Sequence, residues 1–358
     1  MPPASLPPQT PQSAGRAPNG RATLSDVARA AEVDTSTASR VLNSDLGHRV
    51  GAATRERVLA AAQALGYQPN PLARALRTAR SCTLGIAVPQ LENPVFPEII
   101  LGAETAARQR GHALLISHSD DAGGDGRHYE ELARVSRVDG LLVATLEDDR
   151  LLARALAKTG LPFVVLNRRL ADGGDHVVFD SFAAARLATE HLLELGHRRI
   201  AHLAGSAAGY NGLRRLAGYR TALEAAGIAF DPALVSEAGY TFGGGELALH
   251  ALLDRGLPPT ALVASTVLAA AGALKGLHAR QLRVPQDLSI VGIHDVAIAE
   301  MLHPPLTTVR LPLREMGARA AHALIDLIER KTERVACELG VEGLVLRSST
   351  APPLARRS

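Results

Sequence analysis

The chain has 358 residues, a length that allows two or three domains and at least one sizeable hydrophobic core. Its formal net charge of +3 is typical of an ordinary soluble protein, and its longest apolar-leaning run, residues 261–274, is too short to cross a membrane. Two cysteines, Cys82 and Cys337, exclude a cysteine-rich metal site or a disulfide framework and favour a reducing compartment.

The first 22 residues are rich in Pro, Ser, Gln and Ala and lack the apolar core of a signal peptide. We expect a disordered leader over residues 1–22 and a cytoplasmic protein. Positive charge is concentrated next to this leader: residues 21–80 hold nine Arg against five acidic residues, whereas residues 81–358 hold 29 basic against 31 acidic residues. A polyanionic partner is therefore expected to meet the front of the chain.

Three short helices are predicted between residues 23 and 65. Thr23 with Asp26 three positions on is a typical helix N-terminal cap, a second helix starts at Thr35, and a third covers residues 53–65 and ends at Gly66. The apolar residues at helical spacing are Leu24, Val27, Ala28 and Ala31, then Ala38, Val41 and Leu42, then Val58, Leu59, Ala62 and Leu65. Three such helices are the smallest unit that buries a core and still offers one helix to the DNA major groove.

The exposed face of the second predicted helix carries Thr35, Ser36, Ser39 and Arg40. Hydroxyl groups bind phosphates or base edges, and an Arg guanidinium fits the two acceptors of guanine in the major groove. Helical spacing alone is also compatible with a small solvated helical domain that makes no DNA contact. Both readings stay open at this point.

Two stretches, TLSDVARAAEVDTSTASRVLN and TRERVLAAAQALGYQPNPLARALR, resemble the DNA-binding headpiece of the lactose-repressor (LacI-type) family of bacterial transcription regulators. The resemblance implies a helix-turn-helix domain over residues 23–69, with Thr35, Ser36 and Arg40 at base-reading positions of the recognition helix. The other DNA-binding positions that it implies are Thr23, Thr37, Ser39, Asn43, Tyr67, Asn70 and Ala73, among which Ser39 and Asn43 support the helix and face phosphates. The turn SDLGHR after Asn43 is longer than is usual in the family, and we expect it to change backbone contacts more than base readout.

Residues 70–80 are expected to form a hinge. The segment NPLARAL is too short to be stable as an isolated helix, so another part of the assembly must hold it. In the family that it resembles, this hinge becomes helical when two subunits meet over the operator. The residue at the position of Leu76 then enters the minor groove and unstacks a base step. The alternative is an ordinary linker leucine that packs on the core.

From Cys82 onward, short apolar runs alternate with segments of helical period, such as residues 183–195 and 212–226. The predicted strands cover residues 84–88, 113–117, 140–144, 163–166, 199–203, 261–264 and 289–293. Alternating strands and helices predict parallel sheets with right-handed crossovers, in an α/β fold. Because about 270 residues exceed what one such sheet needs, we expect two similar lobes with a ligand cleft at the carboxyl ends of their strands.

This half also resembles the effector-binding core of the same family, which has the shape of periplasmic sugar-binding proteins. The motifs RVDGLLV, LGHRRIAHLAG, RLAGYRTAL, VPQDLSIVG, PPLTTVRLP and LVLRSST stand in the expected order. The resemblance implies a core over residues 81–350 and a tail over residues 351–358. It implies an N-lobe of about residues 82–180 and 311–341 and a C-lobe of about residues 181–306 and 342–350. The implied effector-binding residues are Phe96, Thr145, Asn167, Asp180, Tyr210, Asn211, Arg215 and His294.

Arg215 is the pocket residue with the most specific chemistry, because a guanidinium binds a hydroxyl pair or a carboxylate in bidentate fashion; the alternative is an Arg that ties two helices together. His294 stands where the family usually has an Asp, and it either binds the ligand or is a buried His bonded to Asp295. Its charge is expected to change near neutral pH. Thr266 and Val267 replace a usual Asn-Asp pair, so acceptors are lost. We therefore expect an effector that is more acidic, or more apolar, than a plain hexose.

Catalysis is not expected. The Gly-rich segments at residues 123–124 and 243–245 lack the Lys and Ser/Thr of a phosphate-binding loop, and no hydrolase or metalloprotease motif is present. The scattered histidines, among them His197, His202 and His278, are expected to face solvent or helix ends. A solute-binding protein for transport would need an export signal and no headpiece. We expect no catalytic residue, no metal and no cofactor other than a small-molecule effector.

The resemblance implies an allosteric mechanism in a homodimer. Effector binding in the cleft would change the lobe orientation and the spacing of the two hinges, and so the affinity for double-stranded operator DNA. Two-fold symmetry predicts a near-palindromic operator. A tetramer is not expected, since the tail STAPPLARRS has no heptad of leucines.

Overall fold

The computed structural model describes residues 22–42, 50–68, 80–118, 127–133, 137–145, 149–171, 173–207, 209–256 and 258–354. The chain divides into two compact units, Met1–Arg80 and Ser81–Ser358. Most of the leader, the turn SDLGHR, the hinge residues 70–79 and the end of the tail lie outside the described residues. No helix in the described ranges is long and apolar enough to cross a membrane.

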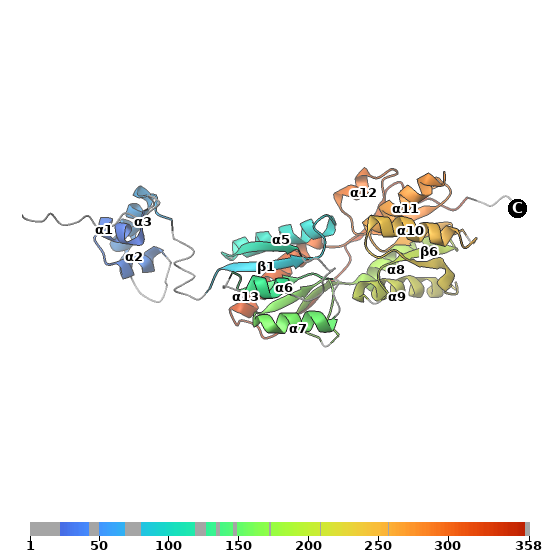
Figure 1. Cartoon of the computed structure of the whole chain (residues 1–358). Helices are drawn as coiled ribbons and strands as arrows, with labels where there is room; N and C mark the ends of the chain where they lie inside the picture. The colour runs from blue at the N-terminus through green and yellow to red at the C-terminus, as the bar shows by residue number, and fades with distance from the viewer. Residues whose placement is uncertain are drawn as a thin grey trace, which may run out of the picture. The chain divides into compact units, whose positions relative to one another are not determined.

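The first unit contains the three predicted helices, α1 (Leu24–Ala30), α2 (Thr35–Leu42) and α3 (Ala52–Ala64) (Figure 1). Thr23 and Asp26 cap α1 reciprocally. The Thr23 Oγ1 accepts from the Asp26 N–H at 3.3 Å, and the Asp26 carboxylate accepts from the Thr23 N–H at 2.9 Å. The buried core of this unit consists of Val27, Ala28, Ala31, Ala38, Val41, Val58 and Ala62.

Three side chains of this unit do not lie where their spacing predicts. On α3, Val58 and Ala62 are buried, but 49% of Leu59 and 41% of Leu65 are exposed, because a core of this size covers only a narrow stripe of the helix. Ser39 is 7% exposed and so does not belong to the exposed face of α2. The reason is that α2 contacts both α1 and α3, which buries a wider arc than its apolar stripe.

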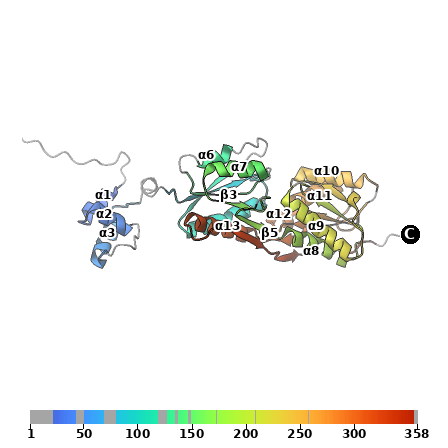
Figure 2. The same ribbon diagram turned by 90° about the horizontal axis from the view of Figure 1, so that it is seen from below.

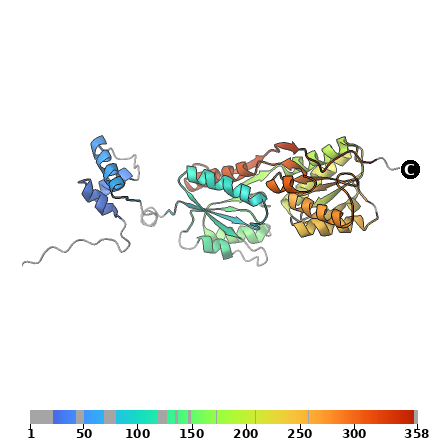
Figure 3. The same ribbon diagram turned by 90° about the horizontal axis from the view of Figure 1, so that it is seen from above.

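The N-lobe of the second unit is a six-stranded sheet in which every pairing is parallel, with the strand order β11-β5-β4-β3-β1-β2. Its strands are β1 (Thr83–Val88), β2 (Ala113–His118), β3 (Gly140–Val143), β4 (Phe163–Leu166), β5 (His176–Phe179) and β11 (Ala336–Leu339). Helices α5 (Val95–Gln109) and α13 (Leu313–Ile328) cover one face, and α6 (Arg127–Ala133) and α7 (Asp149–Thr159) cover the other (Figures 2 and 3).

The C-lobe has the same plan, with the strand order β12-β10-β9-β8-β6-β7, in which only β12 is antiparallel to its neighbour. Its strands are β6 (Ile200–Ala204), β7 (Val235–Glu237), β8 (Ala261–Ala264), β9 (Ser289–Ile293), β10 (Thr307–Arg310) and β12 (Gly343–Val345). Helices α8 (Ser181–Glu194) and α9 (Tyr210–Ala225) pack together, as do α10 (Phe242–Leu253) and α11 (Val267–Ala279) (Figure 2). The short η2 (Pro232–Leu234) and α12 (Ala297–Met301) complete the lobe.

The chain crosses between the lobes three times: between β5 and α8, between β10 and α13, and between β11 and β12. The N-lobe sheet therefore takes strands from residues 83–179 and 336–339, and the C-lobe sheet takes strands from residues 200–310 and 343–345. Both sheets direct the carboxyl ends of their parallel strands to the loops where the site residues lie. This confirms a two-lobed α/β core of parallel sheets.

All seven predicted strands are present, each with its ends within one residue of the prediction. Five further strands, β5, β7, β10, β11 and β12, were not predicted. Each of them has only three or four residues, and β7, β11 and β12 are only partly buried, which weakens their strand signal. Strand β11 pairs with β5 from a distant part of the chain, so tertiary contacts decide that pairing.

Candidate DNA-binding surface and effector cavity

The exposed face of α2 carries Thr35, Ser36 and Arg40, the three residues expected to read bases. Three further predicted residues are half-buried: Thr37 on α2, Thr23 at the start of α1 and Tyr67 after the end of α3. Asn43, Asn70, Ala73 and Leu76 lie outside the described residues, so their DNA-binding roles and the minor-groove wedge stay predictions.

Asp34 organises the start of α2. Its carboxylate accepts from the Thr37 N–H at 2.9 Å, from the Ser36 hydroxyl at 2.5 Å and from the Thr37 hydroxyl at 2.7 Å. These hydrogen bonds, the one from Ser36 above all, hold the pKa of Asp34 well below its usual range. Because the hydroxyl protons of Ser36 and Thr37 are already bound, Ser36 presents oxygen lone pairs to DNA, while Arg40 presents donors.

A cavity of about 1010 Å³ lies between the two lobes of the core. Seven of the eight predicted effector-binding residues line it: Phe96, Thr145, Asn167, Tyr210, Asn211, Arg215 and His294. Asp180 is not among its lining residues. Instead it caps α8 by accepting from the Ala183 N–H at 3.0 Å, and it lies 3.5 Å from the guanidinium of Arg214. The structure thus brings seven predicted side chains together in one cavity, whereas Asp180 caps a helix outside the cavity lining.

Arg215, on α9, forms the floor of this cavity on the C-lobe side. Its side chain is 1% exposed, Nη1 donates to the Ser265 carbonyl oxygen at 2.5 Å, and Nη2 donates to His294 Nε2 at 3.3 Å. Burial lowers the pKa of Arg215 to about 10. The guanidinium therefore remains cationic at neutral pH although it is almost fully buried.

His294 lines the cavity, so its ligand-binding role stays a prediction, whereas the alternative bond to Asp295 and the expected titration disagree with the structure. It follows β9 with a φ of 77°, and its ring contacts Arg215 and not Asp295. Burial, with the neighbouring charge of Arg215, puts the pKa of His294 well below its ordinary value. The expected titration near neutral pH is therefore wrong, and the imidazole is neutral over the physiological range.

Asn211 joins the two lobes at the edge of the cavity. Its Nδ2 donates to the Asn167 carbonyl oxygen at 2.6 Å, and its Oδ1 accepts from the Ser181 hydroxyl at 2.9 Å. Asn167 follows β4 with a φ of 60°, a left-handed conformation that Asn tolerates better than most residues. Its own Oδ1 is buried without a hydrogen-bond partner.

The cavity also contains residues that sequence reasoning did not select. The polar ones are Gln90, Asn93, Arg150, Arg168, Arg169, Ser206, Tyr240, Thr241 and Thr266, of which Thr266 was noted only as a departure from the family pattern. Arg168 and Arg169 come directly after β4, where Asn167 was already predicted to contact the ligand. The position of these residues at the carboxyl end of a parallel strand was the available signal.

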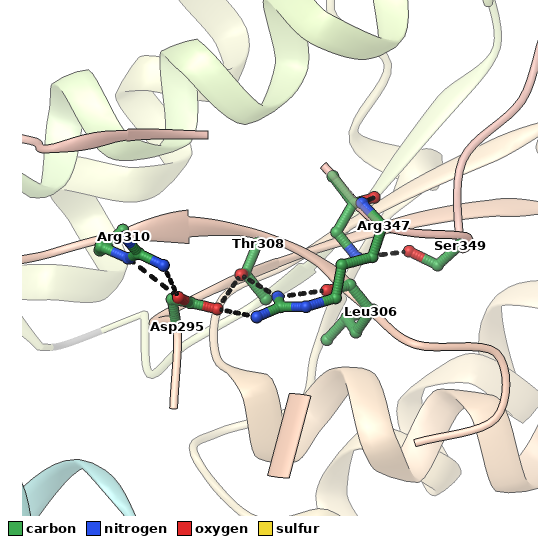
Figure 4. Close-up of polar contacts among 7 residues, drawn as sticks. Asp295, Leu306, Thr308, Arg310, Arg347 and Ser349 are labelled. Atoms are coloured by element: carbon green, nitrogen blue, oxygen red, sulfur yellow. Dashed lines mark hydrogen bonds and ion pairs between the residues drawn. The ribbon is translucent and has the colours of Figure 1, made fainter. Parts of the chain in front are cut away.

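Asp295, next to His294 in the chain, holds an ion-pair cluster in which its own carboxylate is nearly buried and Arg310 is half-exposed (Figure 4). Its carboxylate accepts from Arg310 Nη2 at 2.7 Å and from the Thr308 hydroxyl at 2.8 Å, and it lies 2.8 Å from Arg347 Nη2. Burial alone would raise the pKa of Asp295, but the hydrogen bonds from Arg310, Thr308 and Arg347 lower it. Arg310 is the last residue of β10, just before the chain crosses to the N-lobe. The dipeptide His294-Asp295 therefore connects the cavity floor, through the ion pair of Asp295 with Arg310, to this crossing.

Two family models match the chain. The model of bacterial regulatory proteins of the lacI family matches residues 23–70, and that of the periplasmic binding protein-like domain matches residues 189–350. The first covers the three-helix unit, and the second covers most of the C-lobe together with α13 and β11 of the N-lobe.

Relatives and solved structures agree with these matches. The HTH-type transcriptional regulator CelR of Thermobifida fusca is 38% identical and aligns over 87% of this chain and 93% of that protein. The structure of a CelR–cellobiose complex is 35% identical with a TM-score of 0.71, over 92% of this chain and 100% of that chain. The Lac repressor dimer bound to operator and the anti-inducer ONPF is 30% identical with a TM-score of 0.78, over 92% of this chain and 99% of that chain.

These matches confirm the helix-turn-helix unit and the binding-protein-like core that the sequence resembles. The matching proteins are transcription regulators and not enzymes. This chain is accordingly a DNA-binding transcription regulator with an effector-binding core. The chain belongs to the LacI family of bacterial regulatory proteins.

Proposed function

We propose that this chain is a cytoplasmic repressor that binds a near-palindromic operator as a homodimer, and that a small molecule in the cavity between the lobes sets its operator affinity. The observation that carries this proposal is the cavity of about 1010 Å³, lined from both lobes, in a chain that also has a DNA-binding unit. The CelR–cellobiose complex and the Lac repressor dimer on its operator show relatives in the corresponding bound states.

The cavity supplies a physical route for regulation. A ligand that contacts Phe96 and Thr145 on the N-lobe and Arg215 and His294 on the C-lobe binds best to one relative orientation of the lobes. Its differential affinity for two orientations shifts the equilibrium between them, typically by about 1 to 3 kcal/mol. The orientation then alters operator affinity through the hinge at residues 70–80.

Dimer formation is supported by apolar side chains on the edge of the N-lobe. Strand β2 is at the edge of its sheet, and 37% of Leu115 and 48% of Ile116 on it are exposed. Leu101 on the adjacent helix α5 is 48% exposed. An exposed edge with apolar residues is favourable for association with a second copy.

Selection of genomic fragments by the purified full-length protein, with and without a metabolite extract, tests the proposal. We expect a palindromic site whose recovery changes when the extract is present. A preferred site that the extract does not affect would contradict effector control, and recovery of no preferred sequence under either condition would contradict the operator-binding role.

A further inference from the structure

Arg215 places an uncompensated positive charge at the cavity floor. In the described part of the chain its guanidinium donates to the Ser265 carbonyl oxygen and to His294, its Nε has no hydrogen-bond partner, and it pairs with no carboxylate. A buried cation that has lost its water is costly unless an anion accompanies it. The remaining guanidinium donors are therefore suited to an anion supplied from outside the chain.

His294 adds a second donor at the same place. Since Arg215 can only donate, His294 must accept at Nε2, which leaves the imidazole proton on Nδ1. This Nδ1 is also buried without a partner. The two residues thus offer unpaired N–H groups, Arg215 Nε and His294 Nδ1, and no unpaired acceptor.

Four helices begin at the cavity. Val95 and Tyr210 are the first residues of α5 and α9, while Thr241 and Thr266 are the N-caps of α10 and α11, and all four line the cavity. A helix N-terminus carries a partial positive charge and backbone N–H groups without intrahelical acceptors. Their convergence gives the cavity a positive potential in addition to that of Arg215.

The remaining charged residues of the lining have the same sign. Arg150, Arg168, Arg169 and Arg215 line the cavity, and no Asp or Glu does so among the residues that the structure describes. Arg169 is already paired with Glu338. Arg215 is almost fully buried and pairs with no described carboxylate, so its charge most requires a bound anion.

The opposite wall suits an uncharged carbon skeleton. Val95, Phe96, Leu166 and Leu170 form an apolar surface on the N-lobe side, and the volume of about 1010 Å³ has room for a molecule of mono- or disaccharide size. The Oδ1 of Asn167 is a buried acceptor without a partner and fits a hydroxyl of the same molecule.

We propose that the effector is a small hydroxylated organic anion whose carboxylate or phosphate group binds at Arg215 and His294, with its carbon skeleton against the N-lobe wall. The inference rests on the proposed function of this cavity as the effector site. An anion supplies both the countercharge and the acceptors that the floor lacks. A neutral sugar supplies acceptors but leaves the charge of Arg215 uncompensated.

Three probes with one sugar ring test this inference: glucose, glucuronate and glucose 6-phosphate, each added to the full-length protein at constant ionic strength. We expect glucuronate, glucose 6-phosphate or both to raise Tm by about 2 °C or more at millimolar concentration, and glucose to have no such effect. The charged sugar that acts distinguishes a carboxylate from a phosphate effector. Equal stabilisation by glucose, or no stabilisation by either charged sugar, overturns the inference.

Substitutions at the floor separate a ligand role from a structural one. Arg215→Met should abolish the anion-dependent rise in Tm. The matched control is Arg214→Met on the same helix, which removes a half-exposed guanidinium beside Asp180 and Glu338 and should leave the rise intact. Loss of the rise in both variants, or in neither, overturns the role of Arg215.

His294→Asp keeps the inference testable even where Arg215→Met fails to fold. Asp tolerates the positive φ of this position and places a carboxylate beside Arg215. We expect the unliganded protein to be stabilised and the affinity for the charged sugar to fall about tenfold or more. Unchanged affinity overturns the inference. An anion that binds without altering operator affinity instead contradicts the proposed function, and a neutral sugar that alters it contradicts only the inference.

Discussion

His202, in the middle of the C-lobe, shows how burial controls a titratable residue in this core. Its ring is fully buried, stacks on Tyr219 with a centroid separation of 5.1 Å, and donates from Nδ1 to the Val263 carbonyl oxygen at 3.0 Å. Burial lowers the pKa of His202 to about 4. Of the three histidines expected to face solvent or helix ends, His278 is exposed and His197 follows the C-terminus of α8, although it is buried. His202 lies within the buried strand β6, and a histidine gives no local sign of such burial.

The stability of the core should fall as the pH is lowered from 6.5 towards 4. Between these values His202 is protonated in the unfolded chain but neutral in the folded one, so the unfolded state binds more protons. This group alone removes on the order of 3 kcal/mol from the free energy of unfolding over that window. Urea unfolding at several pH values measures the slope, which should flatten in His202→Gln and stay unchanged in His278→Gln. Identical slopes in all three proteins would show that His202 does not titrate as described.

Arg40 should contribute to base recognition and not only to DNA affinity. We expect Arg40→Ala to weaken operator binding by about 1 to 3 kcal/mol and to relax the preference at one base pair in each half-site, because a guanidinium reads guanine by two hydrogen bonds. Binding to operator and to random DNA is measured by fluorescence anisotropy. Arg29→Ala is the matched control, since Arg29 is an exposed residue of α1 paired with Asp26. Equal loss on both DNAs for Arg40→Ala would refute base reading.

At the scale of elements, the turn after β9 contributes neighbouring residues to two sites, the effector cavity and the ion-pair cluster of Asp295. His294 lines the effector cavity, and Asp295 binds Arg310 of β10 and Arg347 beyond β12. A shift of the backbone at His294 also shifts Asp295, because the two residues are consecutive. The turn is therefore suited to transmit a change at the cavity floor to the strand that leads into the lobe crossing.

Asp295→Asn should destabilise the core by about 3 kcal/mol, because it leaves the guanidinium groups of Arg310 and Arg347 without their shared carboxylate. It should also reduce the effect of the effector on operator affinity. Urea unfolding and operator titration with and without the bound effector measure the two results. Asp287→Asn, which breaks an exposed pair with Arg283 in the turn before β9, should cause a much smaller loss of stability and leave the effector response intact. The same small loss at both positions would argue against the Asp295 cluster as a structural link.

At the scale of the whole molecule, regulation requires two copies of the chain, and the edge strand β2 is where we expect them to meet. Ile116→Asp should convert the dimer to a monomer in sedimentation velocity and weaken operator binding, because a charge is costly in an apolar interface. Leu151→Asp on α7 is the matched control: 48% of each side chain is exposed, but α7 covers the other face of the N-lobe, away from α5. A dimer that survives Ile116→Asp would place the interface elsewhere.

The sequence by itself determined the features that depend on neighbouring residues. The cap formed by Thr23 and Asp26, the three short helices and the seven predicted strands follow from spacing over a few positions, and the structure contains all of them. The alternation of strand and helix also determined a parallel α/β core, since that order has few compact solutions. The family motifs then placed seven side chains that line one cavity.

Only the tertiary structure decided features that depend on distant contacts. It buried Ser39, made Asp180 a helix cap outside the cavity lining, and paired β11 with β5, which lies far away in the chain. It also made His294 a neutral donor beside Arg215, although 79 positions separate the two residues. Burial and charge compensation are properties of the packed environment, and no local pattern carries them.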